Sequence, residues 1–101
     1  MPVVTIRILA PMSEQLGLAQ NGKRAILELT VEPGACIRDV ITQLTKQYPA
    51  FRAIALEPEA ERLIRNILLT VNGQLITASD MYDLPLTDQD EIVLLPMISG
   101  G

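Results

Sequence analysis

The chain has 101 residues, a length that holds one compact domain and leaves no room for two hydrophobic cores. Apolar residues make up 49% and charged residues 20%, which excludes a disordered polypeptide, and the net charge of −4 argues against nucleic-acid binding, which needs a basic surface. One cysteine and no histidine exclude an internal disulfide and a Cys/His zinc site.

The first half of the chain predicts two strands and one helix. Val3–Leu9 and Ala25–Val31 each alternate apolar and polar residues, the pattern of a strand with one buried face. Pro11–Gly22, between them, is predicted to be a loop. From near Cys36, apolar residues recur at helical spacing, and Pro49 is expected to end that helix. The apolar stripe consists of Ile37, Val40, Ile41, Leu44 and Tyr48.

The next part of the chain gives one ambiguous signal and one clear one. The pattern of residues in Phe51–Asn66 does not distinguish between a short helix and a loop. Ile67–Val71 is predicted to be a strand, and Asn72-Gly73 is a strong hairpin signal before a second strand over Leu75–Thr77. Val3–Leu9 and Ala25–Val31 are expected to form a first hairpin with a long loop, and these segments predict a second.

The last part of the chain completes a two-layer domain. Met81–Leu86 is predicted to be a tight turn or a short 3₁₀ helix, and Glu91–Leu95 is the final strand, which Pro96 ends. Hairpins and one packed helix on a common sheet make an α+β fold. We expect a body of residues 1–96 followed by a flexible tail of residues 97–101.

One face of the sheet is a candidate docking surface. Apolar residues are consecutive in the strands that contain Leu68 and Leu95, so both faces of the sheet are apolar there. One helix covers only one face, and the other continues toward Met97 and Ile98. Exposed contiguous apolar surface commonly marks an interaction site. The alternative is that residues 51–65 fold across this face and bury it.

Four short stretches, in their order along the chain, resemble the ubiquitin-like β-grasp sulfur carriers of the MoaD/ThiS type. They are Val31–Gly34 leading into Ile37–Val40, Val71–Gly73, Asp88–Ile92, and Leu95–Gly101 with its terminal Gly-Gly. The likeness covers almost the whole chain and is greatest to the small subunit of molybdopterin synthase. It implies a β-grasp fold, with a mixed sheet of four to five strands packed on one main helix.

The resemblance also implies chemistry at the C-terminus. In such proteins a ubiquitin-activating-type enzyme uses ATP to adenylate the terminal carboxylate, which is then converted to a thiocarboxylate. By this likeness Gly101 reacts, and Gly100 helps the tail to enter a narrow active site because it has no Cβ. We expect the partner-binding residues to be Leu68, Leu95, Pro96, Met97, Ile98 and Ser99.

The resemblance implies a sulfur donor rather than an enzyme, with no cofactor or metal bound by the chain itself. The favoured acceptor is the large subunit of molybdopterin synthase, in molybdenum cofactor biosynthesis. Sulfur delivery for cysteine or thiamine synthesis, a ubiquitin-like protein modifier, and a plain binding module without covalent chemistry are the alternatives. The sequence shows no signal peptide and no membrane-spanning run, so we expect a cytoplasmic protein without membrane contact.

Two further groups are given structural roles. Cys36 lies where a helix N-terminus can lower a thiol pKa, but a small helix-entry residue is favoured over a persulfide relay. For Asp88, Asp90 and Glu91 a solvated turn is favoured over a metal site, because three acids without other ligand types form no cage for an ion.

Overall fold

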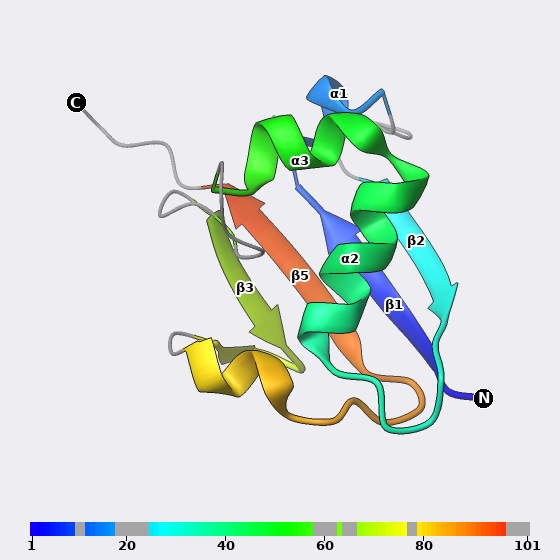
Figure 1. Ribbon diagram of the computed structural model, residues 1–101. Coiled ribbons are helices and arrows are strands. Elements are labelled where there is room, and N and C mark those ends of the chain that lie inside the picture. Colours follow the sequence, from blue (N-terminus) through cyan, green and yellow to red (C-terminus); the bar gives the residue numbers. More distant parts are fainter. Residues whose placement is uncertain (10–11, 18–24, 58–62, 64–66, 77–78, 97–101) are drawn as a thin grey trace.

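The computed structural model describes residues 1–9, 12–17, 25–57, 63, 67–76 and 79–96. One five-stranded sheet organises the fold (Figure 1). Its strands are β1 (Val3–Ile8), β2 (Ala25–Thr30), β3 (Ile67–Val71), β4 (Gln74–Leu75) and β5 (Glu91–Pro96). They lie in the order β2-β1-β5-β3-β4, where β1 and β5 are parallel and the other neighbours antiparallel. The mixed sheet of a β-grasp fold is confirmed.

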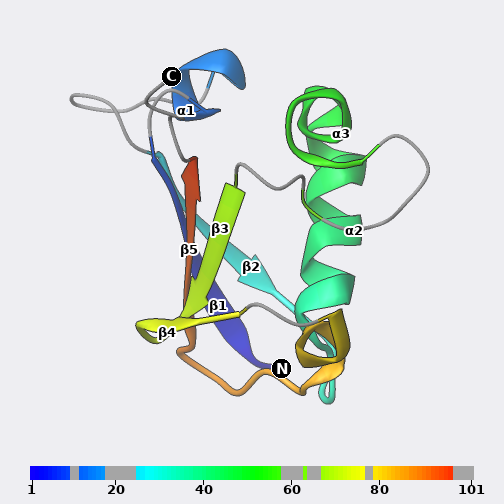
Figure 2. The ribbon, with the colours of Figure 1, turned by 90° about the vertical axis from the view of Figure 1, so that its left-hand side faces the viewer.

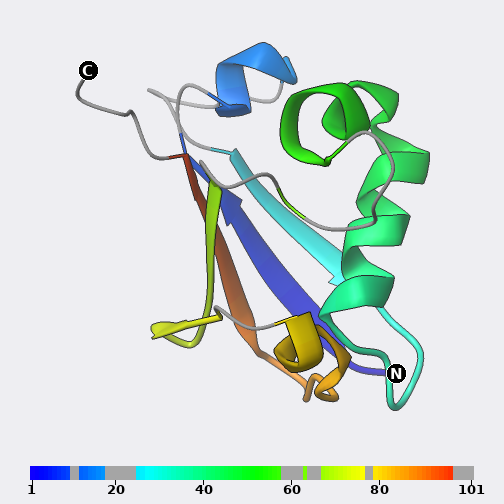
Figure 3. The same cartoon turned by 60° about the vertical axis from the view of Figure 1, so that its left-hand side comes forward.

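The two longest helices lie on one side of this sheet. Helix α2 (Ile37–Gln47) crosses one face, and α3 (Pro49–Ala55) follows it on the same side (Figure 2). The 3₁₀ helix η1 (Ser79–Asp83) lies beside the beginning of α2, and the short helix α1 (Met12–Gln15) lies at the other end of the sheet (Figure 3). Helix α2 is therefore the expected main helix.

The hydrophobic core fills the space between α2 and the sheet. In β1, Val4, Ile6 and Ile8 are fully buried, and the residues between them face the opposite side because strand side chains alternate. Strand β5 adds Ile92 and Leu94 to the same face. The predicted helix stripe meets them, since α2 buries Ile37, Val40, Ile41 and Leu44.

The region that the sequence left undecided begins with a helix. Pro49 ends α2 as expected, but it also starts α3, because the first turn of a helix does not need the N–H that proline lacks. Tyr48 lies between the two helices as the cap of both. Phe51 and Ala55 of α3 are completely buried. Thus the described beginning of the 51–66 segment adds to the core on the α2 side.

The expectation that Pro11–Gly22 is entirely a loop is wrong at one point. Met12–Gln15 forms a single helical turn, in which the Ser13 N–H approaches the Leu9 carbonyl at 3.3 Å. Met12 and Ser13 are buried at the end of the sheet. Four residues are too few to show a helical period, so tertiary burial rather than local pattern decides this turn.

The predicted hairpin is present at Asn72-Gly73. Both residues have positive φ, 51° and 85°, as a type I′ turn requires. The second strand is shorter than expected and begins one residue earlier, over Gln74–Leu75. The chain leaves the ladder at Ile76, whose N–H still donates to the Leu69 carbonyl at 2.9 Å.

Candidate functional site

The candidate site begins where β5 ends. Pro96 is the last residue of the strand and pairs with Ile67 of β3. On the other side, the pairing with β1 stops at Leu94. A proline in a central strand is tolerated only where no further ladder hydrogen bond is needed, so its position marks the end of the strand. The expected reacting and tail residues Met97, Ile98, Ser99, Gly100 and Gly101 lie outside the described residues.

The sheet face opposite α2 carries apolar side chains near this exit. Leu95 is 38% exposed, and Leu68, directly opposite it on β3, is partly buried. Val93 lies two residues before Leu95 on the same strand face, and Ile26 of β2 is 40% exposed. We call Leu68, Val93, Leu95 and Ile26 the open-face patch. In the described part of the chain, α2 and α3 both lie on the other side of the sheet (Figure 2).

A charged pair interrupts the apolar surface of the open face. Arg7 lies between Ile26 and Val93 in the strand register, and its guanidinium is 3.3 Å from the Glu91 carboxylate. The Arg7 Nε atom is buried and has no hydrogen-bond partner. The sequence reasoning did not single out Arg7, although its place among the polar residues that alternate in Val3–Leu9 was the available signal.

A network of hydrogen bonds supports the turn that leads into β5. The Asp90 carboxylate accepts bonds from the Thr87 N–H at 2.8 Å, the Thr87 hydroxyl at 2.9 Å and the Asn72 amide at 2.9 Å. The Asn72 side-chain oxygen Oδ1 in turn accepts the Glu91 N–H at 2.9 Å. Gln89 has φ of 72°, a conformation that glycine adopts without strain. The network thus ties the β3–β4 hairpin to the start of β5.

The same network lowers the pKa of Asp90. Partial burial acts to raise this pKa, but the hydrogen bonds from Thr87 and Asn72 together outweigh it and hold the pKa below its ordinary value. A carboxyl with a lower pKa in the folded chain stabilises the fold above its ordinary pKa, and this contribution is lost as the pH falls through the folded-state pKa.

We expect Asp90→Asn to lower the free energy of unfolding by about 1–2 kcal/mol at pH 7, because the turn loses its charged acceptor. The difference from the unaltered chain shrinks as the pH falls below the ordinary aspartate pKa of about 4, because the carboxylate of the unfolded chain is protonated first and that of the folded chain only at a lower pH. Urea unfolding at several pH values measures both effects. A difference that stays constant from pH 7 to pH 3 would contradict the assignment.

Cys36 and the acidic turn form hydrogen bonds within the fold. The Cys36 N–H donates to the Asp39 carboxylate at 2.9 Å, and the Cys36 Sγ lies 3.4 Å from the same carboxylate, as at the entry of a capped helix. Asp88 accepts the Val3 N–H at 2.8 Å. Within the described residues no group of three or more acidic, cysteine or histidine residues is placed to bind a metal. Nor does any helix there have both the length and the apolar character of a membrane span.

The sheet with its one main helix defines a ubiquitin-like β-grasp protein. The chain belongs to the ThiS family, whose family model matches residues 6–101. This is a family of sulfur carriers and ubiquitin-like modifiers. No curated protein sequence matches the chain.

Solved structures agree on the fold. The chain is similar to the small archaeal modifier protein SAMP1 of Haloferax volcanii, with a TM-score of 0.78, 20% identity, and coverage of 98% of this chain and 99% of that one. SAMP1 of Methanosarcina acetivorans has a TM-score of 0.69 and 28% identity, covering 100% and 98%. A putative molybdopterin converting factor, subunit 1, of Pyrococcus furiosus has a TM-score of 0.69 and 20% identity, covering 97% and 100%.

Proposed function

We propose that this chain is a sulfur carrier whose C-terminal Gly101 is adenylated and then thiocarboxylated by a ubiquitin-activating-type partner enzyme. The observation that carries the proposal is that the ThiS family match extends through Gly101. The last strand ends at Pro96, five residues earlier, at the edge of the apolar open face. This arrangement suits a body that docks on an enzyme while its terminal residues enter the active site.

The proposed reaction has two displacements. A carboxylate is a poor electrophile, so one oxygen of the Gly101 carboxylate first attacks the α-phosphorus of ATP, and pyrophosphate leaves. The sulfur of a sulfide donor then attacks the acyl carbon of the adenylate, and AMP leaves with the electron pair of the broken C–O bond. The product is a C-terminal thiocarboxylate. Glycine favours both steps, because it brings no Cβ into a narrow channel.

For the pathway we favour sulfur delivery to the large subunit of molybdopterin synthase. The support is the sequence resemblance to the small subunit of that enzyme along nearly the whole chain. The similarity to the molybdopterin converting factor subunit of Pyrococcus furiosus supports this choice. Delivery for cysteine or thiamine synthesis uses the same terminal chemistry and is distinguished by the acceptor enzyme that consumes the thiocarboxylate.

A second candidate is a protein modifier that is conjugated through Gly101. It is favoured by the 28% identity to a protein named as a small archaeal modifier, over the whole of this chain. Conjugation forms an amide with a lysine and so produces larger species on a denaturing gel, whereas a carrier alone does not.

The carrier proposal predicts a change in intact mass. After incubation with an adenylating enzyme, ATP and sulfide, we expect the chain to gain the mass difference between one sulfur and one oxygen. C-terminal fragment ions place the exchange at Gly101. A chain whose mass never changes under conditions that thiocarboxylate a known family member would contradict the proposal.

A further inference from the structure

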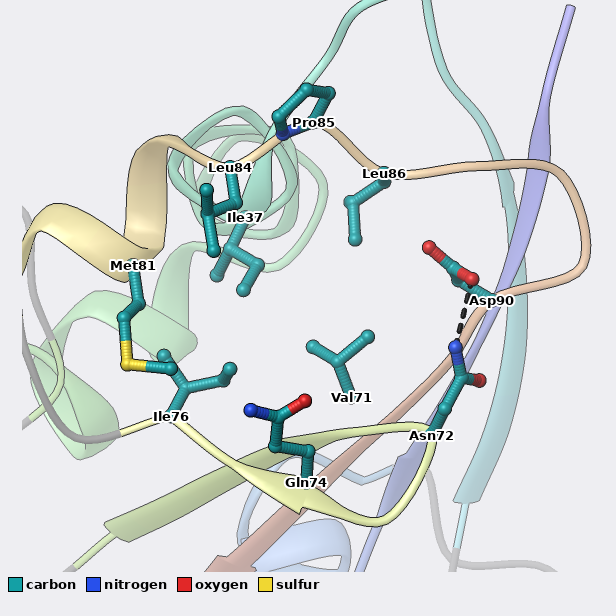
Figure 4. A pocket seen from close by; sticks show the side chains of 10 residues that line it. All are labelled: Ile37, Val71, Asn72, Gln74, Ile76, Met81, Leu84, Pro85, Leu86 and Asp90. Carbon is teal, nitrogen blue, oxygen red and sulfur yellow. Dashed lines mark hydrogen bonds between the residues drawn. The ribbon is translucent and has the colours of Figure 1, made fainter.

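A concave surface lies at the end of the sheet away from the candidate site. A hollow of about 220 Å³ opens between the first turn of α2, the β3–β4 hairpin and residues 81–86 (Figure 4). Strand β5 begins at this end and runs away from it to Pro96. Five steps of about 3.3 Å separate the ends of that strand, so the hollow is roughly 17 Å from the exit of the tail.

Most side chains that line the hollow are apolar, with the polar Asn72, Gln74 and Asp90 among them, and they come from segments far apart in the sequence. Ile37 and Leu86 are buried at its base, and Val71 faces it from the end of β3 (Figure 4). Met81 and Leu84, on either side of the end of η1, form its outer wall. The Leu84 side chain is 54% exposed, which leaves apolar surface in water that a bound group would cover.

The size of the hollow favours one side chain over a cofactor. Pockets for drug-sized ligands hold about 300–1,000 Å³, and they bury most of the ligand surface. A hollow of about 220 Å³ is smaller than this range. Its size suits one large apolar side chain rather than a cofactor.

The rim of the hollow is negatively charged. The Asp90 carboxylate lines it, and its hydrogen bonds come from the neutral groups of Thr87 and Asn72. Among the described residues no basic side chain forms an ion pair with Asp90. At the beginning of α2, the Arg38 Nε is 2.9 Å from the Asp83 carboxylate of η1, and this hydrogen bond raises the pKa of Arg38. The hollow therefore offers a carboxylate without an ion-pair partner among the described residues, beside a mostly apolar cavity.

We propose that the hollow receives an apolar side chain of a partner protein, with an adjacent lysine or arginine of that partner facing Asp90. The apolar side chain covers Leu84 and Met81, while the cation compensates the Asp90 carboxylate at the rim. This docking surface goes beyond the carrier function, because it lies at the other end of the body and does not require the tail. A partner bound here leaves the open-face patch uncovered.

Three blocked dipeptides test this chemistry on the ¹⁵N-labelled full chain by NMR titration: acetyl-Phe-Lys-amide, acetyl-Phe-Gln-amide and acetyl-Phe-Glu-amide. We expect saturable shifts of the Leu84, Leu86 and Asn72 amides, with the lysine peptide binding about threefold or more tightly than the glutamate peptide. The lysine preference falls as salt is added, because the Asp90 contact is partly exposed to solvent. Absence of saturable shifts at these amides, or equal affinity for all three peptides, would overturn the proposal.

Single-residue variants distinguish binding in the hollow from nonspecific binding to exposed apolar surface. Leu84→Lys places a cation over the opening and is expected to abolish binding of the lysine peptide. Leu75→Lys is the matched control, since Leu75 is 43% exposed on the neighbouring strand β4 and does not line the hollow. Asp90→Asn is expected to remove the preference for lysine over glutamine. If Leu84→Lys and Leu75→Lys lose affinity for the lysine peptide equally, or if Leu84→Lys binds it unchanged, the hollow is not the binding site. Peptide binding in the hollow does not depend on thiocarboxylation, so a chain that fails the intact-mass experiment can still bind the lysine peptide.

Discussion

Deletion of Gly101, or addition of one alanine after it, is expected to abolish thiocarboxylation in the presence of adenylating enzyme, ATP and sulfide. In the deletion the carboxylate is withdrawn by one residue from the α-phosphate. In the extension it is displaced beyond the phosphate, and a methyl group enters a channel that accepts glycine. Because positioning errors of about 1 Å reduce enzymatic rates on the order of a hundredfold, a shift of a whole residue removes the reaction. Intact mass measures the outcome.

The control for this prediction is an alanine added before Met1. The side chain of Met1 is 71% exposed, so the addition leaves the body unchanged and should not affect the reaction. The two C-terminal variants should unfold at the same urea concentration as the unaltered chain, since both changes lie beyond the end of β5 at Pro96. Normal thiocarboxylation of the deleted or extended chain would remove Gly101 from the reaction.

A lysine at Leu95 is expected to weaken binding of the adenylating enzyme by about tenfold or more, without unfolding the domain. Leu95 is 38% exposed on the open face, one residue before Pro96, so the variant places a charge where the proposed interface is apolar. Burying that charge against a partner requires removing its water, which costs well over the 1.4 kcal/mol that a tenfold change represents. Leu68→Lys, directly opposite on β3, is expected to act in the same direction.

Ala53→Lys serves as the control for the open-face patch. It introduces the same charge at an exposed apolar position of α3, on the opposite side of the sheet. Calorimetric titration with the adenylating enzyme should therefore give nearly unchanged affinity for Ala53→Lys. If Leu95→Lys also binds normally while remaining folded, the open-face patch is not the docking surface.

Local periodicity predicted most of the elements, because it is visible within a single segment. The alternation in Val3–Leu9 identified β1, and the stripe from Ile37 to Leu44 identified α2 and its buried face. Asn72-Gly73 predicted the hairpin from the backbone conformation those residues favour. Where the local signal was weak, as in the 51–66 segment, the secondary structure was not predicted. Helix α3 lies partly in that segment, and it depends on the burial of Phe51 in a core that other segments form.

The candidate site was only partly accessible from sequence. Consecutive apolar residues around Leu68 and Leu95 indicated that both sheet faces are apolar, but not which face the helices cover. In the structure, α2 and the beginning of the 51–66 segment lie on the same side of the sheet (Figure 2). The described part of that segment therefore does not cover the open face. Arg7 and its pairing with Glu91 were not predicted, because the parallel contact between β1 and β5 joins residues more than eighty positions apart.

By itself the sequence determined the two-layer α+β class, the main helix, the hairpin turn and the position of the terminal Gly-Gly, because each depends on residues close together in the chain. Only the tertiary structure decided the strand order, the open face with its ion pair, and the hollow beside Asp90. The hollow brings together Ile37, Val71 and Leu84, and the ion pair joins Arg7 to Glu91. Such contacts arise only when segments distant in the sequence pack to bury a common core.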